Sequence, residues 1–168
     1  MSGIAIYIYT LSIMYLTAGS LDNFVISRFI SCSHAVGTCF LVLIQCDTAA
    51  LSYSLAYFTL DLIAQIKKRN LLWSFHALIS IIGLPTAFLP VLYQRRAVRY
   101  LLAEISTPFY LLVKTTKNPV AFGIFAFLFF VCRVLWIPYV TIDFSDQGFF
   151  LLPVCAWYAL NVYWFLQI

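Results

Sequence analysis

Long runs of apolar residues, separated by short polar stretches, fill almost the whole chain. A helix needs about 20 apolar residues to cross the hydrocarbon core of a bilayer, because each residue adds only about 1.5 Å. The runs predict seven helices, at residues 1–21, 23–45, 49–66, 71–93, 98–113, 119–140 and 149–168. We therefore expect an all-α integral membrane protein in which six or seven transmembrane helices form a single domain over residues 1–168.

Three of these segments depart from a plain spanning helix. The first ends near "TAGS", which resembles a small-residue cleavage site, but the segment lacks a basic start and is interpreted as a retained helix rather than a signal peptide. The fourth contains Pro85 and Pro90, which should bend or end it. The fifth is short and carries Glu104 and Pro108, so a re-entrant segment is the alternative to a span there.

The composition also favours a membrane environment. The chain is 64% hydrophobic and only 10% charged, with a mean hydropathy of +0.96. A soluble domain carries about 25% charged residues, so this chain has too few charges to cover a surface that faces water. The net charge of +4 comes from short basic clusters between apolar runs, and not from a basic and aromatic stripe that would bind nucleic acid.

The basic clusters predict the orientation of the bundle. With seven spans, six basic residues fall on one side, namely Arg28, Lys67, Lys68, Arg69, Lys114 and Lys117. Three fall on the other side, together with three acidic loop residues: Arg95, Arg96, Arg99, Asp47, Asp143 and Asp146. Because the cytosolic side of a membrane protein carries the excess of lysine and arginine, the C-terminus is expected in the cytosol.

Common catalytic and metal-binding motifs are absent from the sequence. Of the five cysteines, Cys32, Cys39 and Cys46 recur every seven residues and share one helix face, where we interpret them as small buried apolar groups. The sequence has no C-x-x-C pair, P-loop, dinucleotide fingerprint, G-x-S-x-G or H-E-x-x-H motif. We therefore expect no metal and no cofactor.

Two ionisable residues lie close to the basic turn "KKR", inside apolar runs. Asp61 precedes the turn and His76 follows it by similar distances, so they lie at similar depth on two antiparallel neighbouring helices and can meet. A charged residue within a span costs several kcal/mol and normally faces the bundle interior or a water-filled cavity. Four further polar residues fall at similar or middle depths, namely His34, Gln65, Glu104 and Asn161, and Arg133 lies deeper, toward the far leaflet.

These residues have a functional and a structural interpretation. They could line a polar cavity that is open toward the cytosolic leaflet, or they could form interhelical hydrogen bonds worth about 0.6 kcal/mol each. Gln65 lies one turn from Asp61 on the same face, and Glu104 can pair with Arg133, since an unpaired arginine at that depth would be costly. The structural interpretation is favoured for Gln65 and Asn161, and the two remain open for His34.

Six motifs in a fixed order carry a resemblance to a known family. They are "SRFISCSHA", "YFTLDLI", "SFHALIS", "EISTPFYLLV", "FVCRVLW" and "LNVYWFLQI". Over residues 27–168 this order resembles the TLC domain family, whose members include the ceramide synthases and the translocating-chain-associated membrane proteins. The resemblance implies a multi-pass protein of the endoplasmic reticulum.

The resemblance can be carried over residue by residue. The family's aspartate falls on Asp61 and the second of its paired histidines on His76, whereas Phe75 replaces the first histidine. Other family positions fall on Arg28, Ser31, His34, Glu104, Ser106, Pro108, Tyr163 and Trp164. Because ceramide synthases carry both histidines and a following pair of aspartates, the chain is more similar to the other TLC proteins. For those the family implies the handling, sensing or regulation of membrane lipids.

Three hypotheses for function follow. In the first, the bundle holds a membrane lipid, such as one with a fatty acyl chain or a sphingoid-type lipid, and the polar cluster meets its headgroup. In the second, the chain is an acyltransferase acting on a lipid amine, in which His76 is the base or acyl acceptor and Asp61 fixes its tautomer. Acyl-CoA would then be a substrate, drawn to the "KKR" turn by its phosphates. In the third, the chain is a small transporter.

Overall fold

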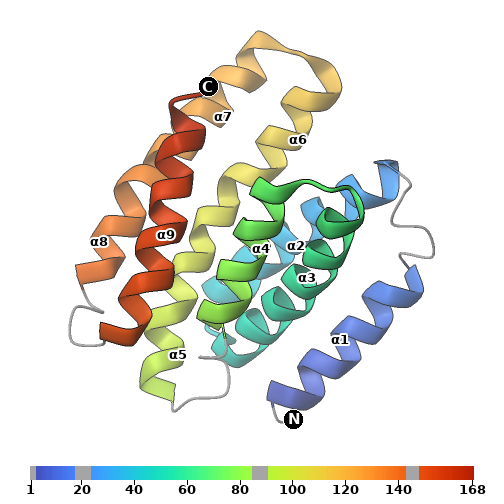
Figure 1. Cartoon of the computed structure of the whole chain (residues 1–168), viewed down its shortest axis with the longest axis vertical. Coiled ribbons are helices and arrows are strands. Elements are labelled where there is room, and N and C mark those ends of the chain that lie inside the picture. The colour runs from blue at the N-terminus through green and yellow to red at the C-terminus, as the bar shows by residue number, and fades with distance from the viewer. Residues whose placement is uncertain (1–2, 18–23, 85–90, 143–147) are drawn as a thin grey trace.

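The computed structural model describes residues 3–17, 24–84, 91–142 and 148–168, and all regular structure within these ranges is helical (Figure 1). The elements are α1 (Gly3–Thr17), α2 (Phe24–Leu43), α3 (Asp47–Lys67), α4 (Leu71–Gly83), α5 (Val91–Ala97), η2 (Val98–Ser106), α6 (Thr107–Thr116), α7 (Pro119–Phe129), η3 (Phe130–Leu135), α8 (Trp136–Ile142) and α9 (Gly148–Phe165). Outside these ranges lie Pro85, Pro90, the last three residues of "TAGS", Asp143 and Asp146.

The predicted bounds of the fourth and fifth segments are wrong. Helix α4 ends at Gly83 instead of continuing to Tyr93. A new helical rod begins at Val91 and continues through α5, η2 and α6 to Thr116. The fifth segment is therefore a full-length rod and not a re-entrant hairpin, as its course from one end of the bundle to the other shows (Figure 1).

The length and composition of the helices test only part of the membrane prediction. Within the described ranges, two helices are long and apolar enough to cross a membrane, judged by length and composition alone: Asp47–Lys67 and Pro119–Ile142. Three shorter apolar helices accompany them, at Arg28–Leu43, Leu71–Gly83 and Leu151–Phe165. The all-α class is thus confirmed, whereas the count of seven spans stays a prediction.

Pro108 explains the unusual winding of the rod from Val91 to Thr116. Proline has no backbone N–H, so the carbonyl of Glu104 four residues earlier loses its α-helical partner. The N–H of Thr107 donates to that carbonyl instead, which is a 3₁₀ hydrogen bond. The 3₁₀ winding extends back over all nine residues of η2, which is longer than the three or four residues that are usual.

The rod from Pro119 to Ile142 contains a π-helical stretch, η3, between α7 and α8. Asn118 caps its start by accepting from the N–H groups of Val120 and Ala121, with Pro119 at the first helical position. A π stretch is wider than an α-helix and occurs most often where a functional side chain must be placed. Arg133, the buried residue of η3, is that side chain here.

Helix α3 lies at the centre of the packing, against α1, α2 and α4. Its residues Leu51, Leu55 and Phe58 belong to the largest group of buried apolar side chains. Helices α3 and α4 pack side by side, joined by a turn in which Asn70 accepts from the N–H of Trp73 at 3.5 Å and so caps α4. The sequence prediction that these two helices are antiparallel neighbours is confirmed.

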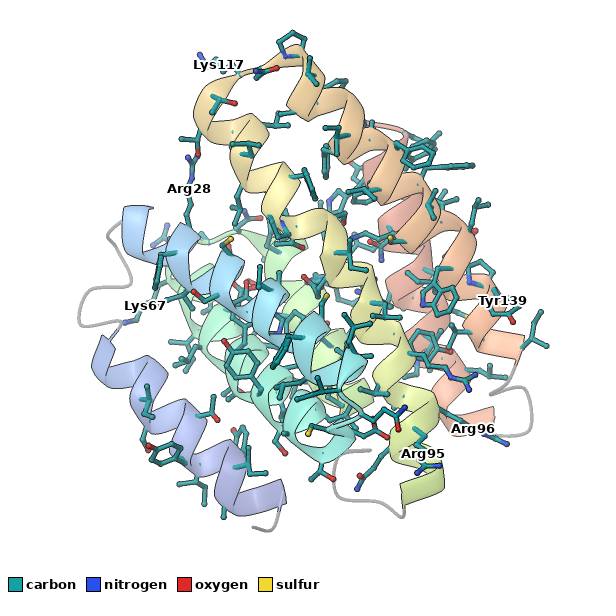
Figure 2. All side chains as sticks on the ribbon, turned by 180° about the vertical axis from the view of Figure 1, so that it is seen from behind. Arg28, Lys67, Arg95, Arg96, Lys117 and Tyr139 are labelled. Carbon is teal, nitrogen blue, oxygen red and sulfur yellow. The ribbon has the colours of Figure 1, made fainter. Side chains whose placement is uncertain are left out.

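Several basic residues lie toward the two ends of the bundle. Figure 2 shows Arg28 and Lys117 toward one end, called the Lys117 end below, and Arg95 and Arg96 at the other, the Arg95 end. Arg28 Nη1 donates to Thr115 Oγ1 at 2.7 Å, and Arg95 Nε lies 4.0 Å from Asp47 Oδ2. Lys67 lies about midway between the two ends in Figure 2, so the predicted grouping of the basic residues on two sides of a membrane stays a prediction.

Gly37 of α2 allows the close approach of α3. A Cβ atom added at Gly37 would lie 3.1 Å from Cε1 of the Tyr53 ring, whereas one added at Gly123, an exposed residue of α7, would meet no atom within 4 Å. A side chain at Gly37 must therefore displace the Tyr53 ring.

Gly37→Val should destabilise the protein by roughly 1–3 kcal/mol, because the branched side chain overpacks the contact between α2 and α3. Gly123→Val is the matched control and should change stability little. Thermal unfolding of the purified protein in detergent measures both. Equal midpoints for the two variants would mean that α2 and α3 do not pack as described.

Candidate functional site

A cavity of about 830 Å³ lies between α3, α4, α6, α7 and α9. It extends from Glu104 and Arg133 in the interior to Lys114 and Lys117 at the Lys117 end. Eight aromatic side chains line it: Tyr57, Phe58, Trp73, Tyr110, Phe122, Phe125, Phe129 and Trp164. A concave, largely apolar cavity of this size with a few polar groups is typical of a small-molecule binding site.

The inner end of the cavity is a hydrogen-bonded network around Arg133. Its Nη2 lies 3.4 Å from Glu104 Oε1 and donates to Thr107 Oγ1 at 3.0 Å, and Thr107 donates in turn to Glu104 Oε2 at 2.7 Å. Its Nε donates to Ser106 Oγ at 3.0 Å and its Nη1 to Asn161 Oδ1 at 3.1 Å. The predicted pair of Glu104 with Arg133 is therefore confirmed.

This network joins three separate rods of the bundle. Arg133 comes from η3, Glu104 and Ser106 from η2, and Asn161 from α9. Arg133 and Glu104 are 6% and 5% exposed, and a buried ion pair is tolerated only when hydrogen bonds satisfy its remaining atoms. Here the guanidinium uses all three nitrogens, and it also lies 5.3 Å from the centre of the Phe129 ring. The wall at this end of the cavity is thus fixed in place.

His76 lies on the cavity wall with no hydrogen-bond partner for its ring. The side chain is only 4% exposed, and neither Nδ1 nor Nε2 makes a hydrogen bond within the described residues. Its ring lies among those of Phe58, Trp73 and Trp164, with centroids 5.2 to 5.9 Å away. A buried polar atom without a partner is costly, which indicates that something other than this chain's described side chains completes the site.

Asp61 does not pair with His76, contrary to the sequence prediction. Both residues line the same cavity, as the sequence predicts. However, Oδ1 of Asp61 accepts from Nε2 of Gln65 at 2.9 Å, one turn along α3, and both nitrogens of His76 stay unpartnered. A residue four positions away on the same helix is a nearer partner than one on the neighbouring helix.

His34 does not line the cavity, and this prediction is wrong. Its ring stacks on Tyr57 with centroids 3.9 Å apart, and its Nε2 is 3.0 Å from Ser54 Oγ. Tyr57 forms the wall and holds Ser31 through a 3.0 Å hydrogen bond between their hydroxyls. His34 therefore supports the wall from behind, because the depth of a residue along a helix does not fix the direction in which it points.

Two other predicted cavity residues also lie behind the wall. Gln65 forms a hydrogen bond to the cavity residue Asp61, and Asn161 accepts one from the cavity residue Arg133. Asn161 Nδ2 also donates to the carbonyl of Trp157 at 2.8 Å, one turn back in α9. Both residues therefore hold cavity residues in position rather than face the space itself, as the structural interpretation favoured for them.

Several cavity residues are not among the predicted site residues, although helical spacing could have identified them. Trp73 lies three residues before His76, and Tyr57 lies four residues before Asp61, so each shares a face with a residue that was identified. Trp164 stacks on Trp73 with centroids 4.5 Å apart and closes the wall between α4 and α9. Trp164 was noted only through the family resemblance, in which it stood beside the exposed Tyr163.

Comparison with known proteins gives no relative: no family model, curated protein or solved structure matches the chain. Among the described residues, no group of three or more histidine, cysteine, aspartate or glutamate side chains is placed to hold a metal ion.

Arg133→Met should lower the free energy of unfolding by roughly 3–5 kcal/mol, because it leaves Glu104 buried without its cation. The double variant Arg133→Met with Glu104→Gln should lose less than this single variant, since no uncompensated charge remains. Arg95→Met is the matched control. Arg95 is 71% exposed beside Asp47, and exposed pairs contribute at most about 1 kcal/mol.

Unfolding of the wild type and the three variants in the same detergent measures these differences. If the double variant were no more stable than Arg133→Met alone, the two residues would not act as a pair.

Proposed function

We propose that the chain is a multi-pass membrane protein of about seven spans that binds a membrane lipid in the cavity beside His76. The single observation that carries the proposal is an aromatic cavity of about 830 Å³ in which a buried histidine lacks any hydrogen-bond partner among the described residues. The walls suit hydrocarbon, and the unpartnered nitrogens require a polar group in the ligand.

The arrangement of polar groups supports a lipid with its headgroup toward the Lys117 end. Lys114 and Lys117 lie at that end of the cavity, and Asp61 lies on its wall. Deeper in, each nitrogen of Arg133 already has a partner within the network. An amphipathic ligand thus finds charged groups at one end and rings along the rest of the cavity.

The spans and their orientation belong to the same proposal. Two helices are apolar and long enough to cross a membrane, and others carry exposed apolar side chains, including Phe29, Phe40 and Leu152. Large exposed apolar surface is unusual for a protein that faces water. With the more basic Lys117 end in the cytosol, the C-terminus lies on the cytosolic side, because it is at that end in Figure 1.

Membership of the TLC domain family, a role in lipid metabolism and a place in the endoplasmic reticulum are part of the proposal too. They rest on the order of the sequence motifs. Arg133 of one motif donates to both Glu104 and Ser106 of another, which supports the motifs as parts of one site.

Acyl transfer at His76 is a second candidate, favoured by the two unpartnered ring nitrogens on the cavity wall. It is the weaker one because Asp61 bonds to Gln65 and does not orient the imidazole. A lipid species that accumulates in cells expressing the wild type and vanishes with His76→Ala would establish it. Unchanged lipid profiles leave binding as the function.

The two ends of the bundle should react from opposite sides of the membrane. In a cysteine-free background, Lys117→Cys should be labelled by an impermeant maleimide only from the cytosolic side, and Arg95→Cys only from the other. Sealed microsomes, with and without detergent, give the measurement. Labelling of both cysteines from the same side would contradict the proposed orientation.

Lipid should co-purify with the wild type and be lost from His76→Phe, which keeps a ring but removes both nitrogens. We expect about a tenfold fall in bound lipid, the equivalent of one good hydrogen bond. Native mass spectrometry after mild detergent extraction measures lipid per protein.

Phe75→Leu is the control, since Phe75 is the neighbour of His76 but is 49% exposed on the outside of the helix. A wild type free of lipid, or equal occupancy in His76→Phe and the control, would refute lipid binding at this site.

A further inference from the structure

A second, smaller cavity of about 70 Å³ adjoins the first on the side of the Arg95 end. Phe58 and Glu104 line both cavities, so the two share a wall. The other walls of the small cavity are almost entirely apolar and include Ile79, Gly83, Ala97 and Leu101. The bundle therefore offers a large chamber with charged groups at its mouth and a small apolar one behind it.

The boundary between the two cavities carries three buried polar atoms that have no partner within the described residues. They are Nδ1 and Nε2 of His76, which lines the large cavity, and Nε1 of Trp157, which lines the small one. The centres of the two rings are 6.4 Å apart. A purely alkyl ligand at this boundary would leave all three atoms unsatisfied, whereas a ligand with oxygen or nitrogen there would give them partners.

We propose that the small cavity is the subsite for the end of an acyl chain whose carbonyl group lies between His76 and Trp157. This inference rests on the proposed lipid site and names its ligand class. The indole N–H of Trp157 donates to the carbonyl oxygen, and a hydroxyl or amide N–H next to the carbonyl pairs with His76. The rest of the molecule occupies the large cavity.

The volume of the small cavity sets the length of the chain. A space of about 10–15 Å³ on this measure holds one water molecule, which is close in size to a methylene group. The small cavity therefore has room for about five methylene groups, and an acyl chain of roughly six to eight carbons fills it.

Gly83 limits the subsite at the end of α4. A Cβ atom added there meets nothing within 4 Å, so a larger side chain can enter the cavity without first displacing a neighbour. The same is true of Gly123, which is exposed on α7 and lines neither cavity. The two glycines therefore form a matched pair, because a leucine fills the subsite at one and not at the other.

The test is a titration of the protein in nanodiscs with monoacylglycerols of 4 to 16 acyl carbons, which carry an ester carbonyl beside hydroxyl groups. Calorimetry gives the dissociation constants. With the wild type, affinity should rise about fourfold per methylene up to roughly six to eight carbons and then level off or fall. Gly83→Leu should move this optimum to a shorter chain, and Gly123→Leu should leave it in place.

Trp157→Phe separates the carbonyl contact from the chain contact. It removes only the N–H donor, so it should weaken every monoacylglycerol up to about tenfold without moving the optimum. Thermal unfolding of each variant confirms that it folds.

An affinity that does not depend on chain length, or an optimum unmoved in Gly83→Leu, overturns the acyl subsite while lipid binding stands. Lipid that co-purifies without any binding of monoacylglycerol also overturns the subsite. Absence of both co-purifying lipid and binding means that the proposed function itself has failed.

Discussion

The arrangement of the bundle depends on one requirement, the pairing of the Arg133 guanidinium. An arginine in an apolar helix is so costly when unpaired that its neighbours must supply acceptors. Those acceptors come from η2, α6 and α9, so one side chain sets how three rods approach one another. The π-helical turn of η3 contributes to this pairing, because Arg133 enters the bundle from it. The cavity begins where this network ends.

The contrast between Arg133 and His76 supports the proposed position of the ligand within the cavity. Both are buried on its wall, yet the first has a partner for every nitrogen and the second has none within the described residues. Fully satisfied networks give rigidity, whereas an unsatisfied group adds free energy that a ligand can recover. The bundle thus combines a fixed inner wall at Arg133 with an unsatisfied histidine, His76, on another helix. The rings around His76 suit hydrocarbon.

The sequence predicts this architecture well where a single physical rule decides it. The length of apolar runs places most helices, the cost of a lone arginine pairs Arg133 with Glu104, and helical spacing puts Gln65 beside Asp61. The direction in which a side chain points around its helix is harder to predict. His34 lies at a suitable depth, but it lies behind Tyr57. The rod from Val91 to Thr116 was predicted only over residues 98–113, because residues up to Tyr93 were assigned to the helix before it. Pro108 suggested a re-entrant alternative, whereas the chain changes its winding and continues. The π-helical turn could not be predicted from the sequence, because the extra residue in that turn does not change the amino-acid composition.

The 3₁₀ winding of η2 also makes the rod that contains it longer. A 3₁₀ helix rises about 2.0 Å per residue and an α-helix about 1.5 Å, so nine residues gain about 4 Å in length. Because Glu104 and Ser106 lie at the C-terminal end of η2, that gain separates α5 from the Arg133 network. A return of η2 to α-helical winding would shorten the rod by the same amount and draw α5 toward the network, past the small cavity that Tyr100 and Leu101 line. The length of the small cavity's wall is therefore set by the winding of one helix, and it can change without any change in how the helices are ordered.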